Sequence, residues 1–102
     1  MTHEEFKEHL CDLGYDGAVV FDDPDYDDAY IGISHDGRVI YSYDRMIESL
    51  IEKDGMTYEE AMEFIDYNTI RAIPYAGEMA PIVLYDDPEY MWKEEESAET
   101  NP

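Results

Sequence analysis

The segment Ser34–Gly37 carries the strongest structural signal in the chain. It separates two short runs of β-branched and aromatic residues, Tyr30–Ile33 and Arg38–Tyr41. Asp36 followed by Gly37 supplies the positive φ angles that a tight turn between antiparallel strands requires. The sequence therefore predicts a β-hairpin here, and with it a sheet against which the remaining segments must pack.

Capping boxes predict two helices, one before the hairpin and one after it. Thr2 with Glu5, and Thr57 with Glu60, have the spacing at which threonine accepts a backbone bond and glutamate reaches back. The first helix is expected over residues 3–13, where apolar residues recur on one face.

A further helix is expected between the hairpin and the second capping box. Asp44 is the predicted N-cap, and the Asp54-Gly55 pair is the predicted stop. With the helix that follows, it should form a helical hairpin over residues 43–67. Helical geometry is disfavoured before a proline, so the next segment is expected to end ahead of Pro74.

Two other runs, Gly17–Phe21 and Pro81–Tyr85, have the composition of short strands. The expected fold class is therefore α+β, with a small antiparallel sheet of about four strands packed against three helices. The expected order is α-β-β-β-α-α-β, with the helices on one face of the sheet. Residues 1–85 should form a single domain, and residues 86–102 an acidic, partly disordered C-terminal tail.

Charge limits the functions that such a domain can have. The chain has 27 aspartate and glutamate residues against 6 lysine and arginine residues, a formal net charge of -21. A field of this sign repels nucleic acid and anionic membranes and attracts cationic surfaces. Direct binding to nucleic acid or membrane is therefore not expected, and a basic protein surface is the expected partner.

The sequence shows neither a signal peptide nor a membrane-spanning run. Cys11 is the single cysteine, so an internal disulfide is not possible, as is usual in reducing compartments. We therefore expect a cytoplasmic protein.

The candidate partner-binding residues lie in an acidic loop and on two predicted helices. Like charges repeated at helical spacing oppose helix formation by about 0.2–0.5 kcal/mol per pair, so their repetition suggests a functional surface. Ordinary solvated helix faces are the alternative interpretation. The candidates are Asp22, Asp23, Asp25, Asp27 and Asp28 in the loop, and Glu48, Glu52, Glu59, Glu63 and Asp66 on the helices.

No catalytic residues and no cofactor are expected. Asp23, Asp25 and Asp27 have the spacing of a calcium loop, but Asp28 stands where that loop requires glycine and Ser34 where it requires glutamate. Weak binding of a divalent cation to this loop stays open. The three histidines, His3, His9 and His35, are expected to be surface residues, and Arg71 is expected to pair with a carboxylate.

Three segments, residues 36–41, 52–57 and 66–75, resemble small acidic proteins of phages and mobile elements, a group with no assigned activity. In size and charge the chain is also similar to the DNA-mimic inhibitors that phages direct against restriction and CRISPR effectors. This likeness implies a non-enzymatic protein that inhibits or modulates a nucleic-acid-binding protein by charge mimicry. The alternatives are a structural or assembly protein that forms a homodimer, and a weak divalent-metal binding module.

Overall fold

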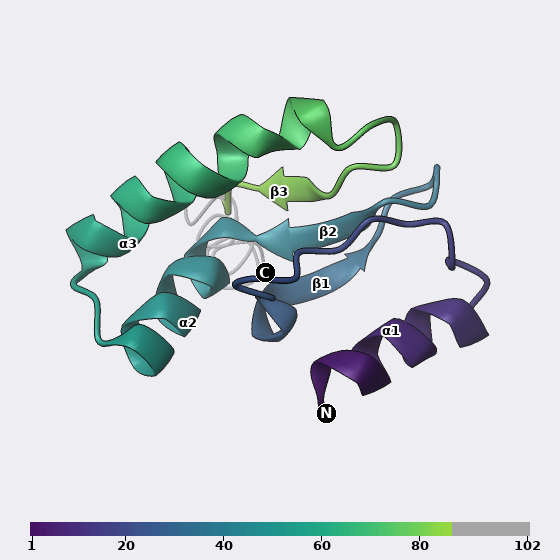
Figure 1. Cartoon of the computed structure of the whole chain (residues 1–102), viewed down its shortest axis with the longest axis horizontal. Coiled ribbons are helices and arrows are strands. Elements are labelled where there is room, and N and C mark those ends of the chain that lie inside the picture. Colours follow the sequence, from purple (N-terminus) through teal and green to yellow (C-terminus); the bar gives the residue numbers. More distant parts are fainter. Residues whose placement is uncertain (87–102) are drawn as a thin grey trace, which may run out of the picture.

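The computed structural model describes residues 1–86, so the predicted tail of residues 86–102 lies, apart from Asp86, outside the described residues. Three helices and three strands make up the α+β fold (Figure 1). In chain order they are α1 (His3–Asp12), β1 (Tyr30–Ile33), β2 (Val39–Ser42), α2 (Tyr43–Asp54), α3 (Tyr58–Phe64) and β3 (Ile82–Leu84). Within this part of the chain, every helix is too short or too polar to cross a membrane.

The predicted hairpin is confirmed. β1 and β2 pair antiparallel, with Ile33 opposite Val39, and a bulge lies between Tyr30 and Gly32. Gly37 adopts a φ of 85°, a left-handed conformation that favours glycine. The turn sequence therefore determines the local backbone, as expected.

Local capping signals also form as predicted, with one exception. Both capping boxes are present, and Gly55 ends α2 with a φ of 68°. The predicted N-cap Asp44 is wrong, because the N-cap of α2 lies two residues earlier. Ser42 is the cap instead, since its hydroxyl accepts a hydrogen bond from the Arg45 amide at 3.3 Å.

Helical structure continues beyond α3 through a π-helical turn, η2 (Ile65–Thr69), and a 3-10 segment, η3 (Ile70–Tyr75). The expectation that helical structure would end before Pro74 is therefore wrong. A proline φ near −65° is compatible with a helical turn, so Pro74 is accommodated in the final turn of η3. The run 58–75 forms one long helical edge of the molecule (Figure 1).

The sheet is mixed, and in this respect the predicted antiparallel sheet is wrong. β2 lies at the centre, antiparallel to β1 and parallel to β3. The chain leaves β2 through α2 and α3 before it returns as β3. Such a long crossover connection is what parallel pairing requires.

The predicted strand at Gly17–Phe21 is absent, so the sheet has three strands and the element order lacks one β. Val19 donates one backbone bond to the Met79 carbonyl at 3.2 Å. The Phe21 amide instead donates to the Tyr41 hydroxyl at 3.2 Å. Because a side chain takes this amide, the segment packs on the core without extending the sheet.

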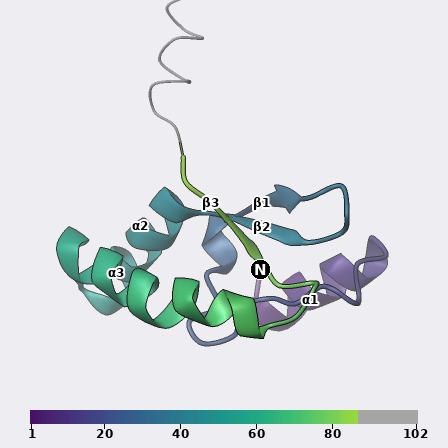
Figure 2. The same cartoon turned by 90° about the horizontal axis from the view of Figure 1, so that it is seen from above.

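The core lies between the sheet and the helices. Tyr41, Met46, Ile47, Leu50 and Ile65 are among its fully buried side chains. Figure 2 shows α1 and α3 on the same side of the strands, consistent with helices that cover one face of the sheet.

Candidate functional site

The acidic loop at residues 22–28 is shaped by one buried aromatic residue. Tyr26 is buried, and its hydroxyl lies 3.2 Å from the Thr69 hydroxyl. The φ of Tyr26 is 53°, a left-handed conformation that costs a non-glycine residue about 1–2 kcal/mol. Burial of the ring offsets this cost, and the resulting path turns Asp25 and Asp27 toward the protein.

His3 binds two loop carboxylates at once. Its Nδ1 lies 2.8 Å from Asp27 Oδ2, and its Nε2 lies 2.7 Å from Asp22 Oδ1. A neutral imidazole has only one N–H, so both nitrogens can donate only when the ring is protonated. The bonds to Asp22 and then Asp27 accordingly raise the pKa of His3. The expectation that His3 is a simple surface residue is wrong.

Asp27 is the most enclosed carboxylate of the loop. Its side chain is 15% exposed, and burial raises its pKa against the opposing effect of the His3 bond. Its Oδ1 is buried and has no hydrogen-bond partner within residues 1–86. The backbone amide of Asp27 donates to Asp25 Oδ1 at 2.9 Å, so Asp25 also holds the loop.

Two lysines neutralise the outer carboxylates of the same loop. Lys7 Nζ lies 3.3 Å from Asp22 Oδ1, and Lys53 Nζ lies 3.1 Å from Asp28 Oδ2. The His3 bond, and after it Lys7, lowers the pKa of Asp22, while the bond to Asp28 raises the pKa of Lys53. Two of the chain's 6 lysine and arginine residues therefore pair with carboxylates of this loop.

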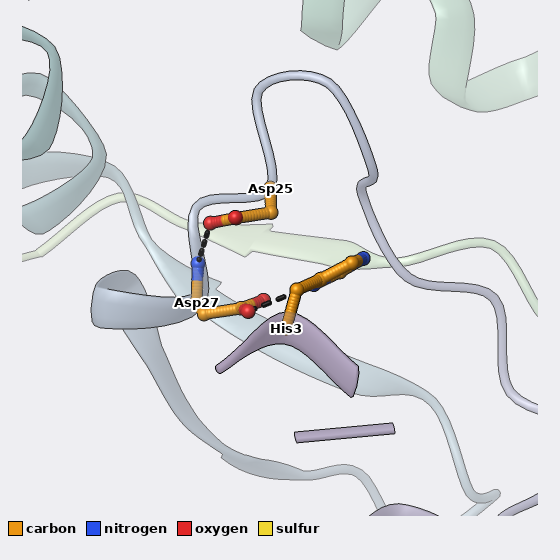
Figure 3. Close-up of side chains that lie close together, drawn as sticks. All are labelled: His3, Asp25 and Asp27. Carbon is orange, nitrogen blue, oxygen red and sulfur yellow. Dashed lines mark hydrogen bonds and ion pairs between the residues drawn. The ribbon is translucent and has the colours of Figure 1, made fainter. Parts of the chain in front are cut away.

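Figure 3 shows His3, Asp25 and Asp27 close together. One ligand-type atom from each lies within 4.8 Å of those of the other two. Imidazole and carboxylate groups at this spacing are of the kind that hold a divalent cation. Both nitrogens of His3 already face carboxylates, however, so a metal would have to displace the proton of the imidazolium. Both ring nitrogens of His3 are thus used within an internal ion-pair cluster, whereas Asp27 Oδ1 has no partner among residues 1–86.

The helical candidates have a different environment. Glu48, Glu52, Glu59 and Glu63 are exposed, and none of them forms an ion pair with another described residue. Asp66 is also exposed, but it accepts a hydrogen bond from the Tyr43 hydroxyl at 3.0 Å. The helices therefore present carboxylates whose charge is not neutralised locally.

Three of these carboxylates, Glu59, Glu63 and Asp66, line one hollow with Met62. The hollow has a volume of about 220 Å³ and opens on the outer side of α3 and η2. It is thus a second place where predicted site residues come together, separate in sequence from the loop. The α2 residues do not line it.

Two exposed tyrosines flank this hollow in sequence, and they are not among the predicted site residues. Tyr58 is 56% exposed and Tyr67 is 71% exposed. In the sequence these tyrosines cannot be told apart from tyrosines of the core. Only their helical spacing beside Glu59 and Glu63 could have identified them. Arg71, for which a carboxylate partner was predicted, forms no ion pair with another residue of 1–86; its guanidinium lies over the Tyr67 ring, 4.8 Å from the centroid.

Comparison with protein-family models, with curated proteins and with solved structures found no match to this chain. The proposals below therefore depend on the geometry and charge of the described residues.

Proposed function

We propose that this protein is a non-enzymatic binding protein that inhibits or modulates a nucleic-acid-binding protein by charge mimicry. The observation that carries the proposal is the set of exposed helical carboxylates without a cationic partner among residues 1–86. These are Glu48 and Glu52 on α2, and Glu59 and Glu63 on α3. In a chain of net charge -21, they give two helices anionic surfaces that attract a basic partner.

The spacing of these carboxylates supports the proposal. Residues four apart on a helix are separated by about 6 Å along its axis. Phosphates along one DNA strand are about 3.4 Å apart, so two adjacent rows of carboxylates approximate the charge density of the strand. Lysine and arginine side chains that bind phosphates would therefore meet carboxylates at similar intervals.

The loop contributes less to partner binding than its acidic composition suggests. Asp22 and Asp28 have lysine partners, and Asp27 is enclosed and bonded to His3. A partner would have to compete with these internal cations. We therefore assign the loop mainly to the internal structure, and the partner-binding role mainly to α2 and α3.

The proposed partner class is a cytoplasmic enzyme with a phosphate-binding basic surface, such as a restriction or CRISPR effector. The immobilised protein would be exposed to a lysate of the native host at low salt, and bound proteins would be eluted with duplex DNA. Each purified candidate would then be titrated with labelled DNA in the presence of this protein.

Competitive loss of DNA binding, with an affinity that falls steeply as salt rises, is the expected result. Release of condensed ions gives this steep dependence when several charged contacts form. If the partner's affinity is unchanged between about 50 and 200 mM salt, charge mimicry is the wrong account.

A further inference from the structure

We propose that the side of the sheet turned away from the helices docks the segment that follows β3, through Tyr90, Met91 and Trp92. This side is called the outer sheet face below, and it consists of Ile31, Gly32, Ile40, Ile82 and Leu84. The proposal is independent of charge mimicry, because it concerns an uncharged surface of the protein and a segment of the same chain.

Alternation along the strands separates the two sides of the sheet. Val39 and Tyr41 in β2 are fully buried in the core, so Ile40 between them points to the other side. Residues directly opposite each other in neighbouring strands point to the same side. Ile40 lies opposite Gly32 of β1 and Ile82 of β3. The outer sheet face therefore runs across all three strands.

The helices of residues 1–86 lie on the other side of the sheet. Figure 2 shows α1 and α3 there, and Met46 and Leu50 of α2 belong to the core on that side. A β-carbon added to Gly32 would meet no described atom within 4 Å, so the space beside it is open. Ile31, at the bulge beside Gly32, is 40% exposed, and Leu84 is 47% exposed. Apolar side chains gathered on one exposed surface are typical of a binding site.

The described chain ends beside this face. Ser42 lies two positions after Ile40 in β2, so its side chain also points outward, and its hydroxyl donates to Asp86 Oδ1 at 2.7 Å. Asp86 is thereby fixed at the edge of the outer sheet face. Trp92 is six residues further on, and an extended chain advances about 3.3 Å per residue, a reach of about 20 Å. Because neighbouring strands are about 4.8 Å apart, the whole width of the sheet lies within that reach.

The segment beyond Asp86 has the composition that this face requires. Tyr90, Met91 and Trp92 are consecutive, and acidic residues both precede and follow them. Aromatic side chains bury large apolar surfaces, and methionine adapts to irregular ones. The strands contain no charged residue, whereas the helices present carboxylates, so an acidic segment meets the least repulsion at the sheet.

A second copy of the chain is a weaker candidate for this face. Each copy has a formal net charge of -21, so two copies repel each other. A segment tethered by a short linker has an effective concentration on the order of millimolar. The occupant is therefore assigned to the same molecule.

Trp92 is the only tryptophan of the chain, so its fluorescence reports on the docking directly. In the full chain, acrylamide should quench this fluorescence several-fold less than it quenches N-acetyltryptophanamide, and dilution of the protein should not change the result. Nuclear Overhauser contacts between the indole ring and the methyl groups of Ile40 and Ile82 should place Trp92 on the outer sheet face.

Two glycine variants separate this face from the rest of the surface. Gly32→Glu adds a carboxylate to the outer sheet face and should raise the quenching of Trp92 toward that of the chain in urea. Gly17→Glu is the matched control, because Gly17 is exposed outside the sheet and an added β-carbon there also meets no described atom within 4 Å. It should leave the fluorescence of Trp92 unchanged. Circular dichroism would verify that both variants fold.

An indole that is quenched as fully as N-acetyltryptophanamide, or equal fluorescence in the two glycine variants, would overturn the proposal. The Overhauser contacts decide it in the unchanged chain if Gly32→Glu does not fold, and their absence would overturn it. Protection of Trp92 that is lost on dilution would assign the face to a second copy and would also show the proposal to be wrong. None of these results would touch the proposed function, which is decided by competition between the partner and DNA.

Discussion

The imidazole of His3 donates from Nδ1 to Asp27 Oδ2 at 2.8 Å, and this bond connects the first turn of α1 to the acidic loop. Nε2 of the same ring donates to Asp22 at 2.7 Å. One protonated side chain thus holds two carboxylates of a strongly acidic protein at fixed positions. The stability of this cluster must depend on the charge of the ring.

Replacing His3 by glutamine should destabilise the protein at pH 5.5 far more than at pH 9. The neighbouring Asp22, Asp25 and Asp27 raise the pKa of His3, while Lys7 beside Asp22 is a nearby cation. Because folding raises this pKa, the contribution to stability is complete below the ordinary value of 6.5 and is lost as pH rises through the folded value. Urea unfolding should show a cost of about 1–2 kcal/mol at the lower pH.

The matched control for this prediction is His9→Gln. His9 is an exposed histidine on the same helix. Its replacement should change the free energy of unfolding by less than about 0.5 kcal/mol at either pH. A His3→Gln cost that is the same at both pH values would show that the ring is not held as an imidazolium.

Asp25 and Asp23 carry the same charge in the same loop, yet their replacement by alanine should have different effects. Asp25 accepts a bond from the Asp27 amide, whereas Asp23 is exposed. We expect Asp25→Ala to lower the free energy of unfolding by about 0.5–1.5 kcal/mol, and Asp23→Ala to be near neutral. Thermal or urea unfolding measures both. Equal effects would mean that the loop is held by charge alone.

Local sequence signals predicted the parts of the fold that depend on few neighbours. Thr2 with Glu5, and Thr57 with Glu60, form their capping boxes because each interaction spans three residues. The hairpin turn at Gly37 forms for a similar reason. The error at Asp44 is also local, because Ser42 lies nearby and has equal chemistry for capping.

Long-range relationships could not be predicted in this way. His3 is separated by 24 residues from Asp27 and by 19 from Asp22, and no spacing rule links them. The parallel pairing of Ile40 with Ile82 likewise depends on the path of the whole helical hairpin. Among the candidate site residues, the sequence indicated the exposed carboxylates on the helices. It did not indicate that internal cations would hold the loop.

Calcium should not bind specifically to the cluster of His3, Asp25 and Asp27. We expect calcium and magnesium at about 1 mM to raise the midpoint of thermal unfolding slightly and equally, by screening repulsion in a chain of net charge -21. Asp25→Asn and Asp23→Asn should respond like the unchanged protein. A calcium response that disappears only in Asp25→Asn would instead establish a metal site at the cluster.

Tyr43→Phe tests the hydrogen bond that joins α2 to η2. The Tyr43 hydroxyl donates to Asp66 Oδ1 at 3.0 Å, and this bond ties the start of α2 to η2. Burial, and after it the bond to Asp66, raises the pKa of Tyr43, so the hydroxyl keeps its proton and donates at neutral pH. Removing it should lower the free energy of unfolding by about 1 kcal/mol in urea.

Tyr58→Phe is the control for Tyr43→Phe, because Tyr58 is 56% exposed and its hydroxyl forms no hydrogen bond with another residue of the described chain. It should leave stability unchanged within about 0.5 kcal/mol. A loss of stability in Tyr58→Phe as large as that in Tyr43→Phe would show that the bond from Tyr43 to Asp66 does not stabilise the contact between α2 and η2.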